Sequence, residues 1–384
     1  MQNKLLIIIA VFYSTCPFAQ TPMQKNNDSG FFPIGVWLQS PSTAETYKKA
    51  GINMFVGVWQ GLDRENLQIF KRNGMKIICD QNEFGLQNLN EPAIFAWMHG
   101  DEPDNAQWNS STQKYDPCID PAIIIRDYHK IKENDPTRPV YLNLGRGVSA
   151  TNWFGRGECT GKTDMYKISQ NGYLKGCDIA SFDIYPVNSS EPEIKDSLWV
   201  VAKGVDNLLE WSDHSKPVWC WIETSRIGEY PERKPTPAEV KSQVWMALIH
   251  GVSGFGYFCH SFYPSLVEAD FLQDKEMLNA ITKINHQVTE LAPVLNSPDI
   301  SDFATVSVDH NSIPVHFLTK HFEGENYIFA VSMRPGVTSA SFSIATGKIL
   351  EVLGENRNIE IENGKFSDNF SNYEVHLYKI SDLQ

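Results

Sequence analysis

The feature that most constrains this chain is an alternation of short apolar runs with helical patterns between residues 31 and 292. Eight runs rich in Val, Ile, Phe and Trp can be counted, at 34–38, 54–59, 76–80, 94–100, 140–144, 179–185, 218–223 and 254–259. Nearly continuous apolar strands are typical of a parallel sheet that is covered on both faces. Eight βα units over this length predict a (β/α)8 barrel at 31–292.

Helical patterns fall between these runs. They are expected at 44–50, 64–73, 122–133, 165–169, 197–212, 237–250 and 274–291. The pattern at 237 has a clear start, because Thr236 can cap the helix and Pro237 suits its first turn. An open doubly wound sheet is the structural alternative. No G-x-G-x-x-G follows the first run, which disfavours a dinucleotide-binding fold.

The texture of the sequence changes after Leu291. Pro293 and Pro298 mark a break, and short alternating segments follow. Turn signals such as Pro335-Gly336 separate these segments, and the whole pattern predicts an antiparallel β-sandwich at 299–384. Its strands are expected at 303–308, 315–320, 327–331, 339–344, 349–352, 359–361 and 375–380.

The N-terminus predicts export. Lys4 supplies a positive charge, residues 5–13 form an apolar stretch too short to span a bilayer, and Ala19 suits a cleavage site. We therefore expect a signal peptide at 1–19 and a secreted or periplasmic protein. A lipoprotein signal with Cys16 as the lipidated residue is the alternative. No other segment approaches the length of a membrane span.

Charge and cysteine content narrow the class of partner. The net charge of −13 argues against a nucleic-acid partner, because an acidic protein repels phosphate. The sequence holds no C-x-x-C and no zinc-ligand spacing, so no metal and no cofactor are predicted. We expect a monomer whose partner is a carbohydrate substrate.

Six cysteines follow the expected signal. Apolar runs contain Cys79, Cys220 and Cys259, which predicts buried free thiols there. The other three cysteines lie in loop-like regions, where an oxidising compartment would allow one disulfide. These three are Cys118, Cys159 and Cys177. The sequence does not say which two of them would pair.

Barrel enzymes carry their sites at the carboxyl ends of the strands. The fourth run leads into His99-Gly100-Asp101-Glu102-Pro103. Pro103 disfavours helix at Glu102, and the next helical pattern begins too far along the chain for these acids to cap it. Glu102 is therefore a candidate catalytic residue.

The seventh run ends in Glu223, after six residues that include Trp219 and Trp221. A lone carboxylate after such a run is costly unless it faces a polar site. The fourth and seventh strands of a closed eight-stranded barrel face each other across its mouth. Glu102 and Glu223 are thus expected to form the carboxylate pair that glycosidic cleavage requires.

Further polar and aromatic residues end the other runs. Asp183 and Tyr185 alternate with Ile184, so both are expected on one face. The full set of predicted substrate-binding residues is Trp37, Trp59, Asp80, His99, Asp101, Asn143, Asp183, Tyr185, Trp221 and His260.

The two glutamates and their setting resemble the clan A retaining glycoside hydrolases. In that clan the fourth strand usually ends in Asn-Glu-Pro, and this chain has Asp101-Glu102-Pro103. The resemblance implies that Glu102 is the acid/base and Glu223 the nucleophile, in a barrel that several such families extend with a sandwich. Asp101 departs from the pattern, and its negative charge would raise the pKa of Glu102.

A second resemblance competes with the first. His99-Gly100-Asp101-Glu102 is similar to the His-Gly-Gly-Asp-Glu stretch of the family 20 hexosaminidases, with one Gly missing. That resemblance implies substrate-assisted cleavage of an N-acetylhexosamine, with Glu102 as the acid and Asp101 orienting the 2-acetamido group. Glu223 would then only bind substrate. A non-catalytic carbohydrate-binding barrel is the third alternative.

Overall fold

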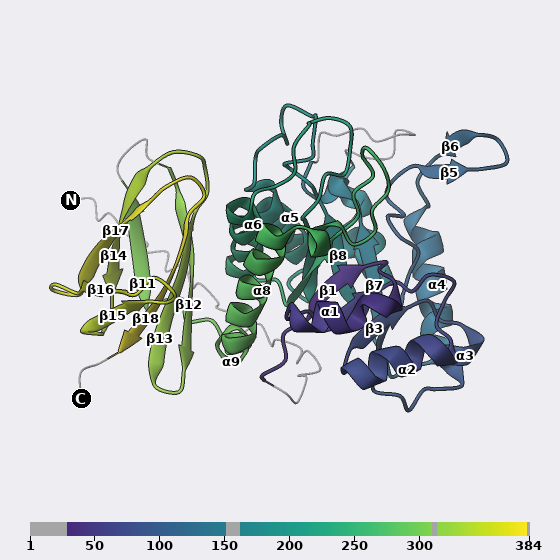
Figure 1. The fold of residues 1–384 in the computed structure, drawn as a ribbon, viewed down its shortest axis with the longest axis horizontal. Helices are drawn as coiled ribbons and strands as arrows, with labels where there is room; N and C mark the ends of the chain where they lie inside the picture. Colours follow the sequence, from purple (N-terminus) through teal and green to yellow (C-terminus); the bar gives the residue numbers. More distant parts are fainter. Residues whose placement is uncertain (1–28, 151–161, 309–312, 382–384) are drawn as a thin grey trace, which may run out of the picture.

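The computed structural model describes residues 29–150, 162–308 and 313–381. The expected signal peptide at 1–19, Cys16 and Cys159 lie outside the described residues. Within them, a barrel is followed by two antiparallel sheets (Figure 1).

Eight parallel strands close the barrel in the order β1-β10-β9-β8-β7-β4-β3-β2, which confirms the predicted (β/α)8 fold. Each strand falls within one of the eight apolar runs. Their bounds are β1 Ile34–Trp37, β2 Met54–Val56, β3 Lys76–Cys79, β4 Ile94–Met98, β7 Val140–Leu144, β8 Ile179–Asp183, β9 Val218–Glu223 and β10 Gly254–Phe258.

Large aromatic side chains fill the inside of the barrel. Trp219 and Trp221 alternate on β9 and belong to a cluster with Trp37 and Tyr141. Space for the indoles comes from glycines on the neighbouring strand β10. A Cβ on Gly256 would lie 2.1 Å from the Trp221 ring, so only glycine fits there. Side chains therefore fill the centre of the barrel below its mouth.

Helices cover the outside of the barrel. Capping residues set several of their ends: Thr236 and Glu239 form a capping box at the start of α6, and Gly74 ends α2 with a φ of 65°. The helices are α1 Ala44–Lys49, α2 Arg64–Asn73, α3 Glu83–Leu86, α4 Pro121–Asn134, α5 Val200–Trp211, α6 Pro237–Ile249, α7 Asp270–Gln273, α8 Lys275–Glu290 and α9 Ala292–Leu295.

One local prediction is wrong, and one local element was missed. The helix expected at 165–169 is instead part of a series of short 3₁₀ turns, because Asn171 takes a left-handed conformation and Gly172 follows it. A hairpin that was not predicted, β5 Gln107–Asn109 and β6 Lys114–Asp116, lies between β4 and α4. Figure 1 shows this hairpin projecting from the barrel.

The C-terminal strands form two antiparallel sheets, of order β11-β14-β17 and β12-β13-β18-β15-β16. The segment β17 was not predicted, because Asp368 shares its inward face with Phe366 and Phe370 and hides the alternation. Arg357 pairs with Asp368 at 2.7 Å. The strands are β11 Ala304–Val308, β12 Val315–Phe322, β13 Glu325–Ser332, β14 Thr338–Ile344, β15 Ile349–Val352, β16 Arg357–Glu360, β17 Lys365–Phe370 and β18 Val375–Ser381.

The sandwich packs against one side of the barrel through α6, which lies beside the sheets in Figure 1. Trp245 of α6 contacts Phe329 of β13 with ring centroids 5.3 Å apart. The Ser242 hydroxyl donates to the Tyr373 carbonyl oxygen at 2.7 Å. All of these side chains are buried, so the sandwich supports the barrel wall behind α6.

The thiols of Cys79, Cys220 and Cys259 are buried, as predicted. Cys177 is also a buried free thiol, so it takes part in no disulfide, and burial raises its pKa to about 12. Among the residues that the structure describes, no helix is long and apolar enough to cross a membrane.

Candidate active site

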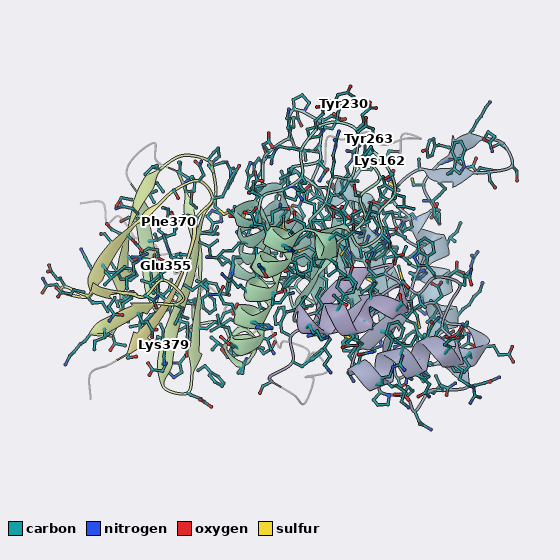
Figure 2. All side chains as sticks on the ribbon, viewed as in Figure 1. Lys162, Tyr230, Tyr263, Glu355, Phe370 and Lys379 are labelled. Atoms are coloured by element: carbon teal, nitrogen blue, oxygen red, sulfur yellow. The ribbon has the colours of Figure 1, made fainter. Side chains whose placement is uncertain are left out.

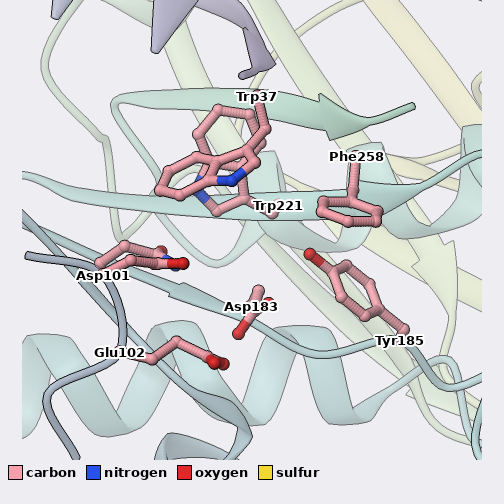
Figure 3. Close-up of a pocket in the computed structure, with 8 residues that line it drawn as sticks. Trp37, Asp101, Glu102, Asp183, Tyr185, Trp221 and Phe258 are labelled. Atoms are coloured by element: carbon pink, nitrogen blue, oxygen red, sulfur yellow. The ribbon is translucent and has the colours of Figure 1, made fainter. Parts of the chain in front are cut away.

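A pocket of about 230 Å³ opens at the carboxyl ends of the barrel strands (Figure 3). Six of the eight strands contribute to it, either directly or through the loop that follows. The lining residues are Trp37, Asp101, Glu102, Asn143, Asp183, Tyr185, Trp221 and Phe258. The structure thus brings together one of the two predicted catalytic residues and six of the predicted substrate-binding residues.

One part of the pocket wall is aromatic. Trp37 and Trp221 meet edge to face with centroids 4.9 Å apart, and Tyr185 contacts Phe258 at 5.2 Å. The Trp221 indole donates to the Tyr141 hydroxyl at 2.8 Å, which fixes its plane. Edge-to-face pairs contribute roughly 0.5–1.5 kcal/mol each beyond their burial. The wall is therefore rigid and offers flat apolar surfaces to a ligand.

The backbone at Glu102 is held in an unusual conformation, with a φ of 42°. Its N–H donates to the Asn143 carbonyl oxygen at 3.0 Å, and its own carbonyl oxygen accepts from the Asn105 N–H at 3.0 Å and from Gln107 Nε2 at 3.1 Å. A left-handed conformation at a residue with a side chain costs on the order of 1–3 kcal/mol and is common at functional sites. The strained turn directs the Glu102 carboxyl group into the pocket.

Because Gly145 has no side chain, it leaves room for the Glu102 carboxyl group. A Cβ on Gly145 would lie 2.8 Å from Glu102 Oε1. The Gly145 N–H donates to Asp104 Oδ1 at 2.8 Å, and the Tyr166 hydroxyl donates to Asp104 Oδ2 at 2.9 Å. Asp104 is buried, and this burial, together with the charge of Glu102, raises its pKa to about 7. Asp104 thus ties the Glu102 turn to the loop after β7.

Asp101 lies at the pocket rim, where the residue is exposed although its carboxyl group is largely enclosed by the walls. Asn143 Nδ2 donates to Asp101 Oδ1 at 3.0 Å. Enclosure raises the pKa of Asp101 to about 7, with the neighbouring charge of Glu102 as the second cause. This carboxyl group is therefore close to half-protonated near neutral pH.

Asp183 faces Glu102 in the same pocket (Figure 3). Burial raises the pKa of Asp183 well above its usual value, and the charges of Glu102 and Asp101 raise it further. The carboxyl groups of Glu102 and Asp101 and the Tyr185 hydroxyl are its polar neighbours in the pocket. Asp183 therefore favours its protonated form more strongly than an exposed aspartate does.

Two oxygen atoms of this cluster have no hydrogen-bond partner within the described part of the chain. They are Asp183 Oδ1 and Asn143 Oδ1, both fully buried. An unsatisfied buried acceptor is costly, and both of these residues line the pocket. A ligand with hydroxyl or amide N–H donors would satisfy them.

Glu223 lies elsewhere. It ends β9 on the same face as Trp221, but it is fully buried and is not among the residues that line the pocket. Its carboxylate accepts from the Val187 N–H at 2.7 Å, from the Asn188 N–H at 2.9 Å and from Asn188 Nδ2 at 2.7 Å. Burial raises its pKa to about 7 although these hydrogen bonds act in the opposite direction. Glu223 therefore does not line the pocket that holds Glu102.

Four other predicted residues are also absent from the pocket lining. Trp59 is 55% exposed on the loop after β2, and Asp80 is exposed after β3. His99 is buried and its ring lies beside the backbone of Ile124 in α4, outside the barrel. His260 is buried behind Phe258, with ring centroids 5.2 Å apart.

Sequence reasoning missed Phe258 and Asp104. For Phe258 a signal existed, because it continues the inward face of Gly254 and Gly256 by the period of two. Asp104 had no comparable signal, since its role depends on contacts with Gly145 and Tyr166 that are remote in sequence. No group of three His, Cys, Asp or Glu able to hold a metal ion occurs among the residues described.

Comparison of the sequence with protein-family models and with curated proteins gives no match. The fold, however, is similar to barrel glycoside hydrolases that carry a C-terminal β domain. An α-amylase from Anoxybacillus is 10% identical with a TM-score of 0.55, over 93% of this chain and 99% of that chain. AmyP, solved in complex with maltose, is 10% identical with a TM-score of 0.56, over 92% and 97%.

A third similar structure is α-galactosidase I from Mortierella vinacea. It is 8% identical with a TM-score of 0.51, over 93% of this chain and 98% of that chain. At such low identities the likeness is one of fold, and the chemistry has to be argued from the pocket itself.

Proposed function

We propose that this chain is a glycoside hydrolase in which Glu102 is the general acid/base. The observation that carries the proposal is the Glu102 carboxyl group, directed by a strained turn into an aromatic-walled pocket beside Asp101 and Asp183. Strain and clustered carboxyl groups at the mouth of a barrel are typical of catalytic sites. The likeness of the fold to glycoside hydrolases agrees with this assignment.

The substrate class follows from which carboxyl groups the pocket holds. A double displacement needs a second, ionised carboxylate on the other side of the glycosidic bond from the acid. Asp183 faces Glu102, but burial raises its pKa well above the usual value, which disfavours the ionised form that a nucleophile needs. Glu223 is occupied by three donors outside the pocket. We therefore assign the nucleophile to the substrate, as the 2-acetamido group of an N-acetylhexosamine.

In this mechanism Glu102 donates its proton to the glycosidic oxygen. The bond from the anomeric carbon to that oxygen breaks while the acetamido oxygen bonds to the anomeric carbon. Asp101, held by Asn143, accepts the acetamido N–H and orients the group. The Glu102 carboxylate then removes a proton from a water molecule, whose oxygen opens the cyclic intermediate with net retention.

Asp183 supports Glu102 in this scheme. Burial raises the pKa of Asp183 well above its usual value, so Asp183 adds little negative charge beside Glu102 and the leaving oxygen. The Tyr185 hydroxyl lies beside Asp183 in the same pocket. The aromatic wall formed by Trp37 and Trp221 packs against the sugar ring.

The volume of the pocket favours action at a chain end. About 230 Å³ is below the range of roughly 300–1,000 Å³ that is usual for larger ligands. A space of that size holds one sugar ring.

The test compares matched aryl glycosides that carry either a 2-acetamido or a 2-hydroxy group. We expect turnover of the 2-acetamido compound only, and competitive inhibition by a thiazoline that mimics the cyclic intermediate. Asp101→Asn should lower kcat by about a hundredfold, because an amide cannot accept the N–H as strongly.

Two other results would contradict this proposal, and the first would favour a double displacement through Glu223. Turnover of a 2-hydroxy glycoside, with a 2-deoxy-2-fluoro analogue trapped covalently on Glu223, contradicts the substrate-assisted proposal. Binding of sugars without turnover of any glycoside would instead identify a non-catalytic carbohydrate-binding barrel.

We also propose that the protein is exported, from the signal-like sequence at 1–19. Fractionation of producing cells tests this: the mature chain is expected outside the cytoplasm. If the unaltered chain is found in the membrane fraction and the Cys16→Ser variant is not, Cys16 carries a lipid anchor. If both are soluble outside the cytoplasm, the signal is cleaved after Ala19.

A further inference from the structure

A chain of aromatic rings leads from the pocket to the surface. Phe258 lines the pocket, and the rings of His260 and Phe262 lie 5.2 and 6.2 Å from it. His260 and Phe262 stack with an interplanar angle of 7° and centroids 5.9 Å apart. Phe262 is 51% exposed. An apolar ring is thus presented to solvent directly outside the pocket.

The loop that carries Phe262 is firmly held. Ser261 and Val267 exchange two backbone hydrogen bonds of 2.9 and 2.8 Å, and the Ser261 hydroxyl donates to the Arg226 carbonyl oxygen at 2.9 Å. The Arg226 guanidinium lies 4.3 Å from the centroid of Tyr263, which Figure 2 places among the loops above the barrel. Such fastening limits the entropy that the loop would lose on binding.

A second exposed ring lies on the same side of the mouth. Trp59 is 55% exposed, and its indole donates to the Leu38 carbonyl oxygen at 2.9 Å. The His260 ring also lies beside the backbone of Leu38. Because β10, β1 and β2 are neighbours in the barrel, the loops with Phe262, Leu38 and Trp59 form one continuous rim.

The Leu38 turn is itself strained, with a φ of 44°. Gln39 Nε2 donates to the Glu268 carbonyl oxygen at 2.9 Å, which joins this turn to the end of the Phe262 loop. These contacts hold the two exposed rings in place at the mouth of the barrel. We call Phe262 and Trp59 the aromatic rim.

We propose that the aromatic rim binds the sugar rings next to the one held in the pocket, so that the substrate is an oligosaccharide rather than a single glycoside. This inference rests on the proposed glycosidase function. The pocket holds one sugar ring, so any further ring of the chain has to lie outside it. The rings of the rim are continuous with the pocket wall through Phe258, and flat aromatic faces suit the apolar faces of sugars.

The test measures kcat/KM for two substrates of one enzyme. One is the fluoride of a single 2-acetamido sugar, whose leaving group is too small to reach the rim. The other is a tetrasaccharide of 2-acetamido sugar units, such as a chitin fragment. Phe262→Ala is expected to lower kcat/KM about five- to tenfold for the tetrasaccharide and to leave the fluoride within about twofold. Trp59→Ala should act in the same direction.

Leu266→Ala is the matched control, because Leu266 is 66% exposed on the same loop and is aliphatic. It should leave both substrates unchanged. Phe262→Tyr should retain tetrasaccharide activity, because the ring is preserved. Equal losses on both substrates for Phe262→Ala would overturn the proposal, since they would mean that Phe262 only supports the pocket.

A binding measurement separates failure of the rim from failure of the proposed function. Calorimetry with the same tetrasaccharide uses Glu102→Gln, with and without Phe262→Ala. A five- to tenfold weaker affinity without the ring supports the rim even if no glycoside is hydrolysed. Equal affinities, or no binding of the tetrasaccharide, overturn it.

Discussion

The ends of β4 and β9 look alike in sequence and differ in the folded protein. Each leads an apolar run into a glutamate near the mouth of the barrel. Glu102 follows β4 on a strained turn and faces the pocket with two other carboxyl groups. Glu223 ends β9 and is saturated by donors of Val187 and Asn188.

The difference comes from the loop after β8. Asn188 donates to both Glu223 and the Ser225 carbonyl oxygen, and its own side-chain oxygen accepts from the Ile227 N–H at 2.8 Å. The loop thus closes over the end of β9 and uses the Glu223 carboxylate as a structural acceptor. A strand-end glutamate is therefore a catalytic candidate only when the neighbouring loop leaves its carboxylate uncovered.

The largest expected effect comes from the pocket glutamate. Glu102→Gln should lower kcat by about a thousandfold, since general acid catalysis contributes roughly 10²–10⁴-fold. Thermal stability should change little, because Glu102 is only half-buried. Steady-state kinetics and a melting curve check both points. If the variant retains more than about a tenth of the activity, Glu102 is not the general acid of the reaction.

The next effect concerns the position of the Glu102 carboxyl group. Gly145→Ala places a methyl 2.8 Å from Glu102 Oε1 and should displace it, with kcat reduced about ten- to a hundredfold. Gly100→Ala is the control, because no atom lies within 4 Å of a Cβ there. Equal activities of the two variants would show that the close approach of Gly145 is unimportant.

Glu223→Gln should lower stability and leave turnover nearly unchanged, which is the reverse of what we expect for Glu102→Gln. Its amide group would face a backbone donor, so the free energy of unfolding should fall by about 1–3 kcal/mol while kcat stays within about threefold. Chemical denaturation and kinetics measure the two quantities. Loss of turnover with unchanged stability would instead support Glu223 as the nucleophile of a double displacement.

The smallest effect is a change in how stability depends on pH. Asp104 has an ordinary value of 3.8 and a folded-state pKa of about 7, so it stabilises the fold below about pH 4, and this contribution is lost as the pH rises through about 7. Asp104→Asn should flatten the decline in unfolding free energy between about pH 4 and 7, by on the order of 1–3 kcal/mol. Unfolding curves at several pH values measure it, and an unchanged slope would contradict the assignment.

Asp101 and Glu223 contribute a decline of the same sign, because burial raises the pKa of each to about 7. Some of the slope should therefore persist in the Asp104→Asn variant. The side-chain carbonyl oxygen introduced by this substitution could still accept from the Tyr166 hydroxyl, as the Asp104 carboxyl group does, so a collapse of the fold is not expected.

Much of the architecture was predictable from the sequence. The apolar runs predicted all eight barrel strands within a few residues, and caps such as Thr236 and Gly74 indicated helix ends, because periodicity and capping are local properties. Period-two alternation also placed Asp183 and Tyr185 in one pocket. It failed at β17, where Asp368 pairs inside the sandwich with Arg357, a residue from another strand.

By itself, then, the sequence determined a (β/α)8 barrel with an antiparallel extension, and a mouth lined with acids and aromatic residues. Only the tertiary structure decided which acid faces the pocket. That choice depends on a loop from β8 covering Glu223, and on Asn143 and Gly145 of the β7 region fixing the turn of Glu102. Such contacts join residues about 35 to 45 positions apart, and no local pattern encodes them, because whether a buried carboxyl group is satisfied depends on which donors the fold brings to it.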